Sequence, residues 1–127
     1  MIEVLTVAVG GAIGTLARRH AGAYVHVRAN RRLGLVDELP FGTLAVNVVG
    51  SFVLGVSAEL ALAGTFPGWA AVGVGAGLCG GLTTFSTVAV DLARLARDRK
   101  FLRLILELVA GALLPIAAAW AGTLLAT

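Results

Sequence analysis

The chain has 127 residues, of which 58% are hydrophobic and only 13% are charged. Soluble domains are roughly half apolar and a quarter charged, so this composition excludes an ordinary water-soluble globule and most soluble enzymes. The 17 glycines and a mean hydropathy of +0.94 indicate apolar helices that pack through small residues in a membrane. The formal net charge of +3 would suit nucleic acid only if basic residues gathered on a soluble face.

Four apolar stretches are long enough to cross a bilayer, which takes about 20 residues of helix. They cover approximately residues 2–26, 41–63, 68–93 and 102–126. The sequence therefore predicts an all-α membrane protein with four transmembrane helices in one domain, residues 1–127. The first stretch carries Glu3 where a signal peptide would be basic, so we expect it to remain as the first helix.

The basic residues gather around the first and third connections between these stretches, and the second connection and both tails have none. With four spans, the first and third connections share one side of the membrane. The positive-inside rule places them in the cytoplasm and both termini outside. Because topology explains the basic residues, we expect no nucleic-acid partner. They are Arg18, Arg19, Arg28, Arg31, Arg32, Arg94, Arg97, Arg99, Lys100 and Arg103.

The second stretch carries a polar stripe. Thr43, Asn47, Gly50 and Ser51 recur at steps of three or four residues, which places them on one face of a helix. Polar side chains at membrane depth cost free energy, so they are candidates for a functional site. Stripes of small residues with an asparagine are equally typical of helix packing in membranes. The stripe alone therefore leaves both interpretations open.

The third stretch predicts a helix that breaks near its middle. The pair Gly80 and Gly81 precedes a run of five residues in which four carry hydroxyls. A break frees backbone groups, which is tolerated in a membrane only where they line a cavity, meet protein or bind an ion. Carbonyls freed between Gly80 and Thr84 would suit a hard cation such as Na⁺, and the next helix N-terminus would favour an anion. The alternative is a glycine-rich packing face whose hydroxyls bond to their own backbone.

No constellation of residues indicates catalysis. Asp91, Glu59 and Glu107 lie in the apolar stretches without a base or a metal ligand at a usable helical spacing. Asp91 instead has Arg94 three residues further on, which is the spacing of an ion pair on a helix. Cys79 is the only cysteine, which excludes an internal disulfide and a paired-cysteine metal or redox site. We therefore expect that the protein is not an enzyme.

Three runs of sequence carry a specific pattern of glycine, hydroxyl and asparagine residues. They are Gly10-Gly11 with Gly14 and Arg18, then Gly42-Thr43-Leu44 with Val46-Asn47 and Gly50-Ser51-Phe52, then GGLTTFST over residues 80–87. In order and spacing this pattern resembles the Fluc (CrcB) family of fluoride channels over nearly the whole chain. The resemblance implies an antiparallel dimer with a central Na⁺ and two narrow pores. Fluoride would leave a bacterial or archaeal cell passively through its plasma membrane.

The resemblance also implies roles for residues of this chain. The backbone carbonyls of Gly80 and Thr83 in both subunits would hold the Na⁺. Asn47 would donate its amide to fluoride, and Phe85 would present the positive edge of its ring to the ion. Arg18 would lie toward a cytoplasmic vestibule. The other pore residues that the resemblance implies are Thr43, Ser86, Thr87 and Asp91.

Three features depart from the family pattern. Val88 stands where the family has a second phenylalanine, and no serine or tyrosine occurs from Phe101 to Thr127, where the family has hydroxyls that face the pore. Glu107 lies near the expected serine position. The one-sided basic residues would fix a single orientation, whereas an antiparallel dimer of one chain must insert both ways. We therefore expect one half of a heterodimer, paired with an oppositely oriented paralogue, with one competent pore.

Two other membrane functions fit four short helices. A small multidrug-type transporter would need a glutamate inside its first helix, but that helix has only Glu3, at its end. A membrane assembly or scaffold subunit would make the glycine and threonine clusters packing features alone. Substitution of Asn47 or Phe85 separates these functions, because a channel would lose fluoride resistance and a scaffold would lose assembly.

Overall fold

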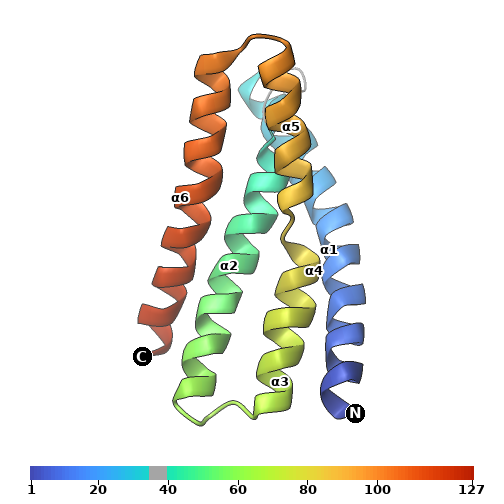
Figure 1. The fold of residues 1–127 in the computed structure, drawn as a ribbon, viewed down its shortest axis with the longest axis vertical. Helices are drawn as coiled ribbons and strands as arrows, with labels where there is room; N and C mark the ends of the chain where they lie inside the picture. Colours follow the sequence, from blue (N-terminus) through green and yellow to red (C-terminus); the bar gives the residue numbers. More distant parts are fainter. Residues whose placement is uncertain (35–39) are drawn as a thin grey trace.

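The chain folds into a bundle of helices. The computed structural model describes residues 1–34 and 40–127, and within these ranges the regular structure is entirely helical. Figure 1 shows the helices side by side, with both termini at the same end of the bundle. The predicted all-α fold is confirmed. The helices are α1 (Ile2–Leu33), α2 (Phe41–Leu62), α3 (Gly68–Val72), η1 (Gly73–Cys79), α4 (Gly80–Leu82), α5 (Phe85–Arg97) and α6 (Phe101–Ala126).

Glycines hold the helices together at close range. α2 packs along α6, and α1 packs along η1. A Cβ atom on Gly14 of α1 would collide with the Leu78 carbonyl oxygen, and one on Gly55 of α2 would collide with the Ala119 carbonyl oxygen. Small residues at such crossings let backbones touch, which is how membrane helices associate where lipid supplies no hydrophobic driving force.

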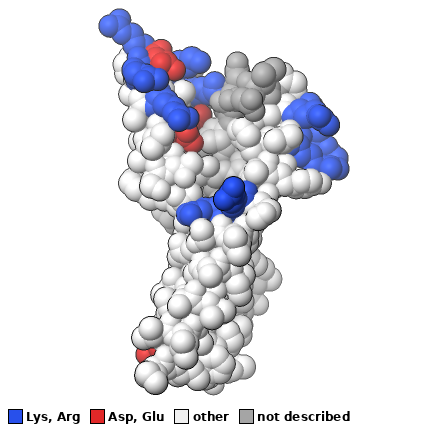
Figure 2. Space-filling model, turned by 90° about the vertical axis from the view of Figure 1, so that its right-hand side faces the viewer, with Lys and Arg blue, Asp and Glu red and all other residues white. Residues whose placement is uncertain are grey.

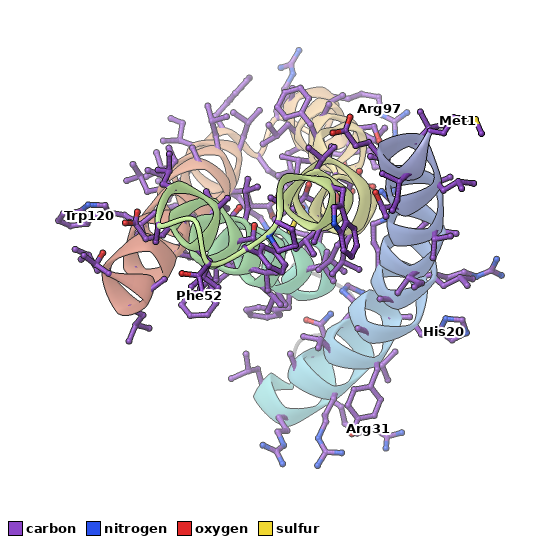
Figure 3. The ribbon with its side chains drawn as sticks, turned by 90° about the horizontal axis from the view of Figure 1, so that it is seen from below. Met1, His20, Arg31, Phe52, Arg97 and Trp120 are labelled. Atoms are coloured by element: carbon purple, nitrogen blue, oxygen red, sulfur yellow. The ribbon has the colours of Figure 1, made fainter. Side chains whose placement is uncertain are left out.

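Most large apolar side chains point away from the bundle. Among the described residues, Val46 and Cys79 are the buried apolar side chains, whereas Leu5 and Trp120 are exposed. Figure 3 shows Trp120 and Phe52 projecting outward from their helices. A contiguous apolar surface of this kind is rare on soluble monomers. It is therefore a surface for lipid or for another subunit.

Three helical units in the described part of the chain are long and apolar enough to cross a membrane. They are α2, the rod from α3 to α5 (Gly68–Arg97) and α6. α1 has the length, at 32 residues, but Arg18, Arg19 and His20 interrupt its apolar run. It nevertheless lies against η1 and α2 within the bundle, where a first membrane helix would lie.

α1 ends later than the sequence predicts. The apolar run stops near residue 26, but the helix continues to Leu33. There Gly34 takes the left-handed conformation (φ 66°) that commonly ends helices. Arg31 and Arg32 in the last turn support the extension, because positive charges stabilise a helix C-terminus. The predicted first connection includes residues 35–39, which lie outside the described residues.

The predicted break in the third span is confirmed. Two residues with extended backbone, Thr83 and Thr84, separate α4 from α5 within the interval where the sequence predicts it. The preceding glycines stay helical and pack instead, since a Cβ atom on Gly81 would press against the Gly11 carbonyl oxygen (2.5 Å). The break and the glycine packing face therefore both exist, on neighbouring residues. The π-helical segment η1 before them was not predicted.

Lysine and arginine gather in one half of the molecule. Figure 2 shows them over the upper half, and the visible face of the lower half has none. The upper half contains α5, the end of α1 and the beginning of α6 (Figure 1). The bundle thus has one basic half and one half whose visible face is almost uncharged.

Candidate functional site

The break lies near mid-height of the bundle (Figure 1). Thr83 (φ −80°, ψ 154°) and Thr84 (φ −150°, ψ 123°) both have extended backbones. The Thr83 hydroxyl donates to the Cys79 carbonyl (2.9 Å), and the Thr84 hydroxyl oxygen caps α5 by accepting from the Thr87 amide (3.4 Å). Threonine suits both positions, because it favours extended backbone and its hydroxyl replaces a lost helix partner.

Asn47 on α2 bridges to the break from the side. Its Nδ2 donates to the Thr84 carbonyl (3.2 Å), and its Oδ1 accepts from the Thr84 amide (2.8 Å). An unbroken helix would direct that amide to the Gly80 carbonyl, so the asparagine takes over a backbone bond. Nδ2 carries two N–H groups, and the Thr84 carbonyl needs one of them. The second N–H group is not needed by Thr84, so the role of Asn47 as a hydrogen-bond donor to an anion stays a prediction.

Arg18 reaches the break from α1. Its Nη1 donates to the Thr83 carbonyl (3.4 Å). The same side chain lines a cavity of about 280 Å³ between α1, α2 and α5. Positive charge, hydroxyls and an imidazole make this cavity polar. Its other polar side chains are His26, Thr43, Thr84 and Thr87.

A groove also runs between α2, α5 and α6, and it too is bordered by residues of the polar stripe of α2. It consists of two cavities of about 230 and 400 Å³, which share Asn47, Val88 and Gly111 in their linings. The smaller cavity is also lined by Thr43 and Asp91. Two polar residues of α2 thus border the same groove as an acid of α5.

Most of the predicted site residues meet around the break. The larger cavity is lined by Phe85, Gly80 and Thr83, so the predicted ring and the two predicted carbonyl residues share it. The Phe85 side chain is 80% exposed and leaves room for a second subunit. Ser86 lines none of these three cavities, and its hydroxyl oxygen lies 3.1 Å from that of Thr84.

Two backbone carbonyls at the break are of the kind that hard cations bind. The Gly80 carbonyl loses its helical donor to Asn47, and the Thr83 carbonyl accepts from Arg18 while keeping a second lone pair. Carbonyl oxygens are ligands of hard cations, which take more than two of them. No group of three or more His, Cys, Asp or Glu side chains that could hold a metal occurs in residues 1–34 and 40–127. A cation here would therefore depend on carbonyls from a second chain.

One ion pair in the groove was not predicted. Arg103 Nε lies 3.4 Å from Glu107 Oε1 on α6, and the two side chains are 21% and 13% exposed. Their i,i+4 spacing is the signal that would have identified the pair. The predicted pair of Asp91 and Arg94 is present at 3.9 Å.

A match to a family model and matches to individual named proteins agree with one another. The model of a family described as CrcB-like protein, Camphor Resistance (CrcB), matches residues 5–123. A protein of Geobacter metallireducens named fluoride-specific ion channel FluC is 35% identical over 99% of this chain and 98% of its own length. FluC 1 of Leifsonia xyli is 40% identical over 95% of this chain and 84% of its own, and FluC 2 of Rhodococcus jostii is 38% identical over 95% and 96%.

Proposed function

This chain belongs to the CrcB family, and on that premise we propose that it is a subunit of a fluoride-selective ion channel that exports fluoride passively. Neutral HF crosses bilayers and ionises inside the cell, where the anion is trapped. A negative-inside potential drives the anion outward with about 2.3 kcal/mol per charge per 100 mV. A selective pore thus gives fluoride resistance without an energy source of its own.

The observation that carries this function is the break with the groove beside it. The groove offers an anion the Asn47 amide, the Thr43 hydroxyl and the Phe85 ring, none of which is a fixed positive charge. Such weak donors bind a small anion without holding it too tightly to leave, which conduction requires. Arg18 supplies positive charge in the neighbouring cavity, where it would concentrate anions at the entrance.

A second subunit in the opposite orientation would complete the site. The exposed Phe85 ring and the open groove need a partner surface, and two antiparallel chains would together offer four carbonyls of Gly80 and Thr83. Basic residues in one half favour a single orientation of this chain. The partner would then be an oppositely oriented paralogue. The numbered names FluC 1 and FluC 2 are what would be given where one genome encodes two such chains, and this supports a paralogous partner.

The same charge distribution supports the proposed topology. The first and third connections would face the cytoplasm of a bacterial or archaeal cell, with both termini outside the plasma membrane. Lipid would cover the exposed apolar faces, such as those that carry Trp120 and Phe52 (Figure 3).

Reconstituted alone, the chain is expected to release fluoride at nearly the rate of empty vesicles. Efflux should rise roughly tenfold or more when the opposite paralogue is added, because a single orientation provides no antiparallel partner. A fluoride electrode measures the release, and chloride efflux serves as the control for leakage. Robust efflux from the chain alone would contradict the heterodimer but not the channel. Efflux from neither preparation would contradict the channel function.

Removal of Na⁺ is expected to destabilise the complex. Carbonyls of Gly80 and Thr83 would supply hard oxygen ligands at the dimer centre. A ligand that binds only the folded complex stabilises it by about 2.7 kcal/mol at 100 times its Kd. The measurement is the Tm of the purified complex in Na⁺ against the same concentration of a large organic cation. An identical Tm in both buffers would contradict a structural Na⁺.

A further inference from the structure

A cavity of about 340 Å³ lies where the chain turns from α5 into α6, at the end of the bundle opposite the two termini (Figure 1). This turn belongs to the basic half of the molecule (Figure 2). The cavity shares Arg103 and Leu106 with the smaller cavity of the groove. Its lining combines basic and apolar side chains, which are Arg99, Lys100, Phe101, Leu102, Arg103 and Leu106.

The ion pairs around this turn leave two positive charges without a partner. Three pairs have a nitrogen and an oxygen at 3.9, 3.8 and 3.4 Å, namely Arg94 with Asp91, Arg97 with Asp98, and Arg103 with Glu107. Over residues 1–34 and 40–127, no carboxylate lies within ion-pair distance of Arg99 or Lys100. Both side chains are exposed. They therefore give the cavity a positive charge that the described part of the chain does not neutralise.

Arg99 occupies a position where helices usually place glycine. The Lys100 amide donates to the Leu95 carbonyl (2.9 Å), and the Arg99 amide donates to the Ala96 carbonyl (3.1 Å). These two bonds form a Schellman motif, which holds one residue in the left-handed conformation, most often glycine. Arg99 takes that conformation (φ 56°), which strains a residue with a Cβ atom. The turn itself thus gives no reason for an arginine, whereas the cavity that its side chain lines does.

The apolar part of the lining faces outward. Phe101, Leu102 and Leu106 are all more than half exposed. They belong to the first turns of α6, a helix long and apolar enough to cross a membrane, and Ile116 further along that helix is exposed as well. A small water-soluble anion would leave these side chains uncovered. A molecule with an anionic head and a hydrocarbon tail matches both parts of the lining.

We propose that this cavity binds the headgroup of an anionic phospholipid. The lipid phosphate would contact Arg99 and Lys100, and an acyl chain would lie along Phe101, Leu102 and Leu106. Basic pockets at the cytoplasmic ends of membrane helices recognise anionic headgroups in this way, and the proposed topology places this turn in the cytoplasmic leaflet. The site needs insertion in a membrane, but it does not depend on fluoride conduction.

Lipid binding to the assembled protein, purified from membranes in detergent, tests this inference. Phosphatidylglycerol and phosphatidylcholine with identical acyl chains are titrated, and native mass spectrometry counts the bound lipid. The wild type should bind phosphatidylglycerol more tightly. Arg99→Gly and Lys100→Gln should each weaken its affinity about fivefold, which is the contribution of one basic residue near an anionic membrane surface. Glycine suits the left-handed turn, so Arg99→Gly should keep the fold.

Arg31→Gln is the matched control, because it removes a basic charge in the last turn of α1, outside this cavity, and should leave the affinity unchanged. Glycerol phosphate, a headgroup without acyl chains, should compete poorly because it cannot cover the apolar lining. Lys100→Gln leaves the strained position untouched and decides the question if Arg99→Gly does not fold. Equal affinity for the two lipids, an equal loss in Arg31→Gln, or full competition by glycerol phosphate would overturn the inference.

Discussion

Asn47→Ala is expected to reduce fluoride efflux to the level of empty vesicles. The side chain makes two hydrogen bonds to Thr84, and its removal leaves an amide and a carbonyl of the break without these partners. Each orphaned buried backbone group costs about 1–3 kcal/mol. That cost is enough for the break to rearrange and for the groove beside it to lose its shape. The rate of fluoride release per folded complex measures the effect.

Two further substitutions sharpen this prediction. Asn47→Asp keeps an acceptor for the Thr84 amide but sets a carboxylate oxygen against the Thr84 carbonyl, so it should fail as well. Ser51→Ala removes a hydroxyl one turn further along the same stripe, leaves both bonds to Thr84 in place, and should lower efflux far less. Normal efflux from Asn47→Ala would show that other contacts hold the break. Loss of the assembled complex, rather than of efflux, would favour the scaffold function.

Gly14→Ala is expected to prevent the chain from folding. Its new Cβ atom would collide with the Leu78 carbonyl oxygen and lie 2.9 Å from the Leu82 amide nitrogen. Both obstacles are backbone atoms, which cannot rotate away as a side chain does. The collision should therefore cost more than the roughly 1–3 kcal/mol typical of an overpacked core. The amount of folded subunit extracted from membranes, by fluorescence-detected gel filtration, measures the loss.

Gly11→Ala is the control on the same helix. A Cβ atom there would meet its nearest neighbour, the Gly77 carbonyl oxygen, at 3.9 Å, which is ordinary contact. Alanine also favours helix over glycine by about 1 kcal/mol. Folded protein should therefore be recovered at least as well as from the wild type. Equal recovery of the two variants would show that α1 does not pack on η1 as closely as described.

The sequence was sufficient for the all-helical fold and the break, and it named several of the residues that border the groove. Hydropathy locates the spans, and a cluster of hydroxyls after two glycines locates the break, because both signals depend on local chemistry. The polar stripe places Thr43 and Asn47 on one face of α2, and the structure turns that face toward the break. Spacing alone did not show that Asn47 bonds to Thr84, since that bond depends on how two helices pack.

The features that the sequence missed depend on packing or on weak local signals. The apolar run of α1 stops before its helix does, because arginines form helix well although they are not apolar. The i,i+4 spacing of Arg103 and Glu107 would have identified their ion pair, but its place beside the groove depends on which side of α6 faces α2. The π-helical turns of η1 have no typical amino-acid composition, so only the backbone hydrogen bonds of the structure show them.

The π-helical segment η1 also fixes the length of the third span. Its backbone bonds reach one residue further than those of an α-helix, as in the Gly80 amide that donates to the Gly75 carbonyl. Each residue of an α-helix turns the chain by about 100°. A π-helical turn holds one residue more than an α-helical turn, so deletion of one residue between 73 and 79 would be taken up by a return to α-helical bonding. Deletion of one residue from an α-helical part of the rod would instead rotate Thr84 away from Asn47 around its axis. The rotational phase of the break thus depends on how many α-helical residues precede it, even where a deleted one is small and apolar.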